Sequence, residues 1–262
     1  MRILTSVLIE IKNHFAFQEK KMKKNCNPAF IIAGREIRAY FTSPIAYIVT
    51  GLFLLASGFL FFNTFFLYGR AELRNFFGIL PVLFSFFIPA LTMRLLAEEK
   101  RSGSYETLLT LPVTETQIVI GKFIASFVSG AALLVPTLFY VLTCFIFGKP
   151  DAGPIVGGYL GALFLVASFC AVGLFATSVT KNQIIAFFIA LALSLVLTFI
   201  SNFLIFMPGA LVAFFDYFSA FSHFNSISRG IIDTRDLIYF ASLTAVFLVL
   251  TVRGLKSTRE TR

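Results

Sequence analysis

The chain concentrates charge in one short segment between two long apolar stretches. Charged side chains occupy five of the eight positions from Arg94 to Arg101, and Glu106 follows soon after. Because ionised side chains are costly inside hydrocarbon, this segment is expected at a membrane face, between two spanning helices. Such a polar segment suits docking on another protein. An ordinary solvated loop would carry the same charges, so both interpretations stay open.

No residue pattern in the chain points to catalysis or to a bound metal. His14 and His223 are the only histidines and share no motif, and the three cysteines have no ligand spacing. Gly121-Lys122 lacks the upstream glycine of a phosphate-binding loop. We therefore expect no cofactor, metal or nucleotide site in this chain, and a membrane enzyme is disfavoured.

Composition indicates a polytopic helical membrane protein. Hydrophobic residues make up 58% of the 262 positions and charged residues only 13%, which is about half the usual share for a soluble domain. A transmembrane helix needs about 20 apolar residues. Six segments satisfy this requirement: Ile45–Tyr68, Phe76–Met93, Ile118–Phe147, Ile155–Val179, Ile184–Met207 and Leu237–Val252. The third is longer than a span requires, so we expect its start to be interfacial or tilted.

Lysine and arginine are distributed unequally between the two sides that these spans define. Seventeen of the 22 basic residues fall in the terminal segments, the loops on the same side and the boundary residue Lys122, which could extend its ammonium to water. Basic residues accumulate in cytoplasmic loops, so we expect both termini in the cytoplasm of a bacterium, with the chain in its inner membrane. Topology and attraction to anionic lipid explain the net charge of +9, and a nucleic-acid partner is unnecessary.

The segment before the first span predicts an amphipathic helix on the membrane surface. Pro28 suits a first helical position, and Pro44 ends the helix at Ser43. Arg35, Glu36 and Arg38 would stay in water while the apolar face rests on lipid. This helix is either a lever or an anchor for the topology. Residues 1–21 form a second surface helix, or they precede a true start at Met22.

The charged segment itself predicts two short helical pieces. Glu98 and Glu99 fall early in the first, where acids favour the positive end of a helix. Ser102-Gly103 bends the chain, Tyr105–Leu109 gives a second turn with an apolar edge, and Pro112 ends it. We expect this segment to dock in a groove on a cytoplasmic partner.

The outer loop from Pro208 to Asp236 is too apolar to be solvated, and we expect one or two short re-entrant helices there. A charged cluster precedes the last span and consists of Arg229, Asp233, Arg235 and Asp236. At helical spacing Arg229 and Asp233 could pair. Gly157-x-x-x-Gly161 permits close approach of another helix.

Several of these segments together resemble the permeases of ABC-2 type exporters. The likeness rests on GREIRAYFTSP from Gly34 to Pro44, EEKRSG from Glu98 to Gly103, ETLLTLP from Glu106 to Pro112, and Gly121-Lys122. The outer segment HFNSISRGIIDTRD, from His223 to Asp236, is similar to the branch associated with gliding motility and nitrous-oxide maturation. The resemblance covers about residues 28–255, leaving residues 1–27 as an extension of unknown role and 256–262 as a cytoplasmic tail.

The resemblance implies a six-helix permease that pairs with a second copy or a related permease and binds a dimer of cytoplasmic ABC ATPases, which hold the ATP. It places ATPase coupling on Glu98, Glu99, Arg101, Gly103, Glu106, Leu108 and Leu109. It makes the segment around Arg35, Glu36 and Arg38 a connecting helix. A membrane protein with an extracytoplasmic domain is a further possible partner.

Two functions are compatible with this picture. The chain is a permease that couples ATP hydrolysis to export of an unknown substrate, or it is a non-transporting anchor that transmits ATPase motion to an extracytoplasmic partner. A neighbouring gene for a large periplasmic domain would favour the anchor.

Overall fold

The computed structural model describes residues 27–68, 72–105, 113–148, 150–203, 216–231 and 233–260, and these ranges are helical without a strand. The helices are α2 Pro28–Thr42, α3 Pro44–Tyr68, α4 Arg74–Thr92, α5 Ala97–Ser102, α7 Glu115–Leu134, α8 Leu138–Phe147, α9 Ala152–Val179, α10 Gln183–Phe203, α12 Ala220–Ser228 and α13 Thr234–Glu260. Six helical stretches among the described residues are long and apolar enough to cross a membrane. The predicted all-α fold with six spans is confirmed. The extension before Asn27 lies outside the described residues.

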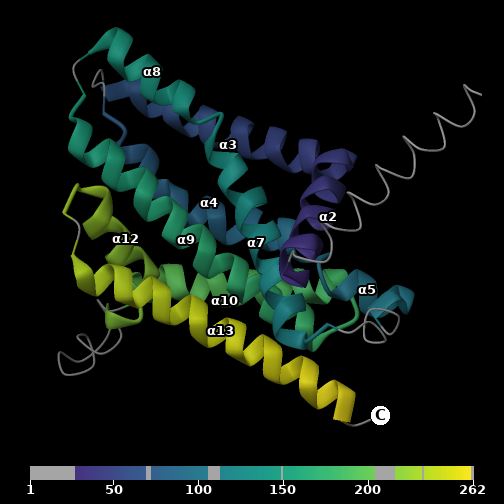
Figure 1. Cartoon of the computed structure of the whole chain (residues 1–262). Helices are drawn as coiled ribbons and strands as arrows, with labels where there is room; N and C mark the ends of the chain where they lie inside the picture. The colour runs from purple at the N-terminus through teal and green to yellow at the C-terminus, as the bar shows by residue number, and fades with distance from the viewer. Residues whose placement is uncertain are drawn as a thin grey trace, which may run out of the picture.

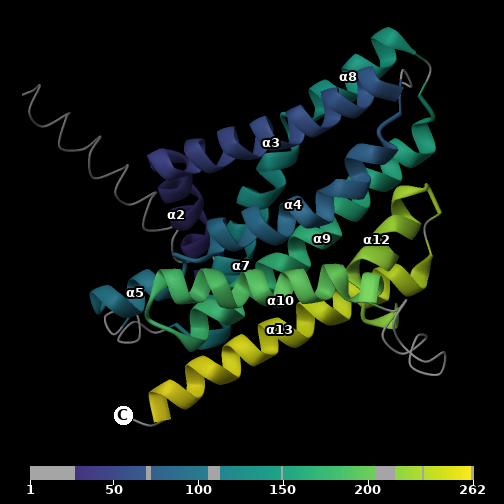
Figure 2. The same cartoon turned by 180° about the vertical axis from the view of Figure 1, so that it is seen from behind.

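The helices form a bundle with two distinct ends (Figures 1 and 2). α2, α5 and the C-terminal end of α13 lie at one end, and α12 and the end of α8 lie at the other. α9 runs through the middle and is the most enclosed span, with 72% of its apolar window buried against 17% for α13. A helix that is apolar all round belongs in such a central position. α3 and α10 are also little enclosed, with 22% of the apolar window buried in each.

The third expected span is two helices. α7 ends at Leu134 and α8 begins at Leu138, with Pro136 in the turn between them. Proline has no N–H and its ring clashes with the preceding helical turn, so the helix breaks there. The long apolar stretch is therefore not one straight helix, because it breaks at Pro136. α8 then lies alongside α3, where the Tyr140 ring stacks on Phe61 at a centroid distance of 4.8 Å.

The last span extends beyond its predicted end. α13 continues from Thr234 to Glu260, past Val252, where we expected the span to end. Arginine and lysine are good helix formers, and a charge that leaves the membrane does not by itself end a helix.

α12 packs against the Gly157-x-x-x-Gly161 motif of α9 in the same chain. A Cβ at Gly157 would overlap the carbonyl oxygen of Ile227, and one at Gly161 would lie 3.1 Å from the Ile227 side chain. Ile227 and Phe224 are buried against this glycine face. The missing side chains let the backbone of α9 approach α12 closely. The motif thus fixes the outer helix on the central span.

Replacement of Gly157 by alanine is expected to destabilise the protein by about 1–3 kcal/mol, the usual cost of forcing extra atoms into a packed contact. Gly153, one turn earlier in α9, has no neighbouring atom within 4 Å of an added Cβ. Gly153→Ala should be neutral or stabilising by up to about 1 kcal/mol, because alanine is the better helix former. Thermal unfolding of both variants in detergent measures the difference. Equal midpoints would contradict the close contact between α9 and α12.

Candidate coupling site

The charged segment forms a short helix with a defined end. α5 begins at Ala97, has Glu98 and Glu99 in its first turn, and ends at Ser102, where Gly103 caps it with a left-handed φ of 76°. Glycine adopts this conformation without the strain of a Cβ. The Ser102 hydroxyl closes the turn by donating to the Glu99 carbonyl at 3.3 Å. The first predicted helical piece and the bend are present, while residues 106–112 lie outside the described residues.

α2 packs its small residues onto α7. The Asn27 side chain accepts a hydrogen bond from the Ala29 amide at 3.2 Å, and Pro28 occupies the first turn, so the helix starts where the sequence predicted. Ala29 and Ala33 are buried. A Cβ at Gly121 of α7 would lie 2.7 Å from the Ala29 carbonyl oxygen. Gly121 thus allows α2 to approach α7 closely, and the next residue, Lys122, points into the junction.

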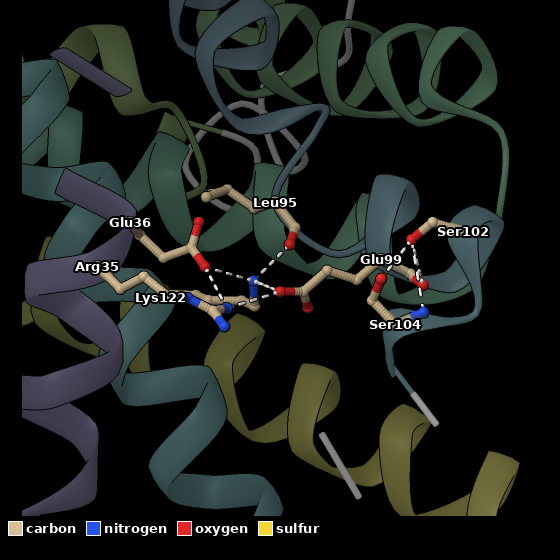
Figure 3. Close-up of polar contacts among 7 residues, drawn as sticks. All are labelled: Arg35, Glu36, Leu95, Glu99, Ser102, Ser104 and Lys122. Atoms are coloured by element: carbon tan, nitrogen blue, oxygen red, sulfur yellow. Dashed lines mark hydrogen bonds and ion pairs between the residues drawn. The ribbon is translucent and has the colours of Figure 1, made fainter. Parts of the chain in front are cut away.

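Lys122 is the centre of a buried ionic cluster, shown in Figure 3. Its side chain is 0% exposed, and its Nζ lies 2.9 Å from Glu99 Oε1 and 3.3 Å from Glu36 Oε1. The same nitrogen donates to the Leu95 carbonyl at 2.6 Å. Leu95 lies in the turn between α4 and α5, where a helix end leaves carbonyls without partners. One ammonium therefore connects α2, α5, α7 and the end of α4.

Arg35 closes the cluster from the solvent side. Its Nη2 lies 2.9 Å from Glu36 Oε1 and 3.1 Å from Glu99 Oε1. The hydrogen bond with Glu36, together with the charges of Glu36 and Glu99, raises the pKa of Arg35 above its ordinary value. Two cations and two carboxylates thus balance each other. Because Arg35 is 58% exposed, solvent screens its attraction to the two carboxylates. Most of the ionic restraint therefore comes from Lys122.

Two further contacts fix α5 to the bundle. The Lys100 ammonium donates to the Ser178 carbonyl at the end of α9. Leu96 and Tyr105, on either side of α5, are buried in a separate apolar cluster with Val119, Leu174 and Leu255. Val119, Leu174 and Leu255 come from α7, α9 and α13, respectively. The inward side of α5 is therefore attached to most of the helices that meet at this end.

The predicted coupling residues divide between the two sides of α5. Glu99 is turned inward and is only 16% exposed, whereas Glu98 is 48% exposed and pairs with Arg94 at 3.0 Å. Arg101, Ser102 and Gly103 are exposed. Glu106, Leu108 and Leu109 fall outside the described residues. The outward surface of α5 thus consists of Glu98 and Arg101 through Gly103.

The predicted residues of α2 divide in the same way. Glu36 is directed inward to Lys122, Arg35 bridges two carboxylates, and Arg38 is exposed. Lys122 itself was expected to extend towards water, but the structure buries it. Sequence reasoning did not predict this cluster, although Gly121-Lys122 and the two acids were already among the residues that carry the family resemblance.

The outer motif is organised around a residue that the sequence interpretation left without a role. His223 Nδ1 lies 2.6 Å from Asp236 Oδ1, and its Nε2 lies 3.1 Å from the Tyr217 carbonyl oxygen. Asp233 instead accepts a hydrogen bond from the Arg235 amide at the start of α13. Gly230, with a φ of 85°, separates α12 from α13. Arg229 and Asp233 therefore do not share a helix, and within the described part of the chain no ion pair joins them.

A bundle of six spans with a charged helix fixed at one end is the architecture of a membrane protein. The sequence model of ABC-2 family transporter proteins matches residues 6–256, and the chain belongs to this family. Its members are the membrane permease components of ABC transporters and are not themselves catalytic. The matched region begins earlier than residue 28, where we expected the resemblance to start. No curated protein matches the chain.

Removal of the buried ammonium should destabilise the protein strongly. Lys122→Met leaves Glu36 and Glu99 with only the half-exposed Arg35, and loss of one partner from a buried ionic group costs about 3–5 kcal/mol. Denaturant unfolding in micelles measures the free energy. The control is Arg38→Gln, an exposed change on α2 expected to stay within about 0.5 kcal/mol. In the double variant Glu99→Gln/Lys122→Met, the loss should be smaller than the sum of the single losses. Strict additivity would argue against the ion pair.

Proposed function

We propose that this chain is the permease subunit of an ATP-driven exporter and that a separate cytoplasmic ATPase docks on α5. The observation that carries the proposal is the two-sided construction of α5. Its inward side is fixed by Glu99, Lys100 and the apolar cluster around Leu96, while Glu98 and Arg101 through Gly103 remain exposed. An exposed polar helix on a rigid attachment is suited to receive a partner and to pass on its motion.

The contacts give this motion a defined route. A displacement of α5 pulls on Lys122 through Glu99, and hence on α7 and on α2, whose Glu36 shares the same ammonium. It also acts on the end of α9 through Lys100 and Ser178. α9 is the central span, so a movement at the docking surface reaches the middle of the bundle. Such coupling requires an element with two arrangements that the partner can bias.

We also propose the membrane in which the chain lies and its orientation there. The end of the bundle with α2 and α5 faces the cytoplasm of a bacterial inner membrane, and ATP is bound by the ATPase. The ATPase dimer requires two permease chains, either two copies or a related pair. Leu108 and Leu109 remain part of the proposed docking segment on sequence grounds. The outer motif favours the branch linked to gliding motility and nitrous-oxide maturation.

Charge reversal on the outward side of α5 should weaken ATPase binding. Glu98→Lys removes an exposed acid without touching the buried cluster, and a surface ion pair contributes up to about 1 kcal/mol, or about fivefold in affinity. Leu109→Asp should cost more than about tenfold, since a buried leucine side chain contributes about 1.5–3 kcal/mol. The measurements are copurification of the ATPase and its stimulated hydrolysis rate.

The matched control is Glu72→Lys, the same charge reversal at an exposed residue of the opposite end. It should leave ATPase recovery unchanged. Normal recovery and normal stimulated hydrolysis in both Glu98→Lys and Leu109→Asp, with correct membrane insertion, would refute docking on this segment.

Reporter fusions test the orientation. Seventeen of 22 basic residues are on the side of both termini, so a cytoplasmic reporter after Arg262 should be active and an extracytoplasmic reporter at the same place inactive. A fusion within residues 69–75 should give the opposite result. A C-terminus outside the cytoplasm would place α5 out of reach of any ATPase.

A further inference from the structure

A pocket opens beside the buried ionic cluster and shares Glu36, Glu98 and Glu99 with the candidate coupling site. Its volume is about 340 Å³, and its walls come from α2, the first turn of α3, the last turn of α4 and α5. Ile45, Ala46 and Leu91 form an apolar wall. Tyr40, Arg94 and Glu99 contribute polar groups to the same space.

The position of the pocket corresponds to the border between hydrocarbon and water. Ile45 and Ala46 are the second and third residues of α3, and Leu91 is next to the last residue of α4. Both helices are membrane spans. The apolar wall therefore belongs to the membrane side, while Arg94 and Glu99 mark the side where charges reach water. A ligand in this place would be amphiphilic, with its polar group towards α5.

The pocket contains a hydrogen-bond acceptor and hydrogen-bond donors that are not in use. Glu99 Oε2 is buried and has no hydrogen-bond partner among the described residues, because only its Oε1 serves the ionic cluster. Arg94 donates from Nε and Nη2 to Glu98, and among the described residues its Nη1 has no partner. The Tyr40 hydroxyl is buried without a hydrogen-bond partner among the described residues, and a phenol can donate. The pocket thus offers an acceptor for a cation and donors for an anion.

We infer that this pocket binds the headgroup of a membrane phospholipid that carries a primary amine, as phosphatidylethanolamine does. The ammonium would approach Glu99 Oε2, and the phosphate would accept from Arg94 and Tyr40. The acyl chains would leave along Ile45 and Leu91. A headgroup of zero net charge also suits the surroundings, because the carboxylates of the ionic cluster and of Glu98 are already balanced by Arg35, Lys122 and Arg94.

The pocket should prefer a headgroup with a primary amine over the other common phospholipid headgroups. Phosphatidylcholine has no N–H to donate to Glu99, and phosphatidylglycerol has no cation at all. A hydrogen bond between charged groups is strong enough to produce about a tenfold preference. The inference does not rest on ATPase docking, and either proposal can fail without the other.

The test is lipid retention by the full chain, followed by native mass spectrometry with an equimolar mixture of phosphatidylethanolamine, phosphatidylcholine and phosphatidylglycerol. One lipid per chain should resist removal, with phosphatidylethanolamine enriched about tenfold over phosphatidylcholine. Ala90→Phe, which places a ring in the pocket wall, should abolish the enrichment. Arg94→Gln should lower retention of all three lipids.

The control for added bulk is Val128→Phe, at an exposed position of α7, and it should retain the preference. Equal retention of phosphatidylethanolamine and phosphatidylcholine by the unmodified chain would overturn the inference. So would unchanged enrichment in both Ala90→Phe and Arg94→Gln. Competition by water-soluble glycerophosphoethanolamine at the same concentration as the lipid would point to a soluble ligand and would also overturn it.

Discussion

The end of the bundle that carries α2 and α5 depends on one buried ammonium. A fully enclosed lysine is tolerated only if carboxylates and carbonyls surround it, because an unpaired charge in a medium of low dielectric is very costly. Glu36 from α2, and Glu99 with the Leu95 carbonyl from the segment around α5, meet this requirement. The positions of α2, α5 and the end of α4 are thereby set relative to α7. Unlike a hydrophobic contact, which is non-directional, the ionic cluster also requires particular side chains to meet.

The middle of the bundle is held together differently. Between apolar helices in lipid, burial from water contributes little, and close packing and interhelical hydrogen bonds take its place. Gly173 lets Thr92 of α4 approach α9, the Ser85 hydroxyl lies 2.8 Å from Thr198 of α10, and Ser168 lies 3.2 Å from Thr244 of α13. These contacts converge on α4 and α9, which are the most enclosed spans. The central helices are therefore joined by short side chains, and the charged cluster is confined to the end.

The sequence predicted the elements better than their contacts. Hydropathy is a local property, so six spans could be recognised, and Pro28, Pro44 and Gly103 marked helix ends by their own backbone chemistry. Pro136 carried the same information about the break between α7 and α8, but the continuous apolar run outweighed it. The ionic cluster joins residues up to 87 positions apart, Arg35 and Lys122, and no periodicity in a single sequence pairs them. The packing of α12 against Gly157 and the contact of His223 with Asp236 also depend on tertiary folding, so local patterns did not predict them.

The spacing within α5 explains how one short helix can serve two sides. Successive helical residues are rotated by about 100° from each other, so Glu98 and Glu99 cannot face the same direction. Glu99 is committed to Lys122, and its replacement would disturb the attachment of α5 as well as any docking surface. Among the described residues, Glu98 pairs only with Arg94, and it is half exposed. The adjacent acids, which the sequence presents as a pair, are therefore separable by mutation. Changes at Glu98 act on the outward surface, whereas changes at Glu99 act on the connection between that surface and the membrane spans.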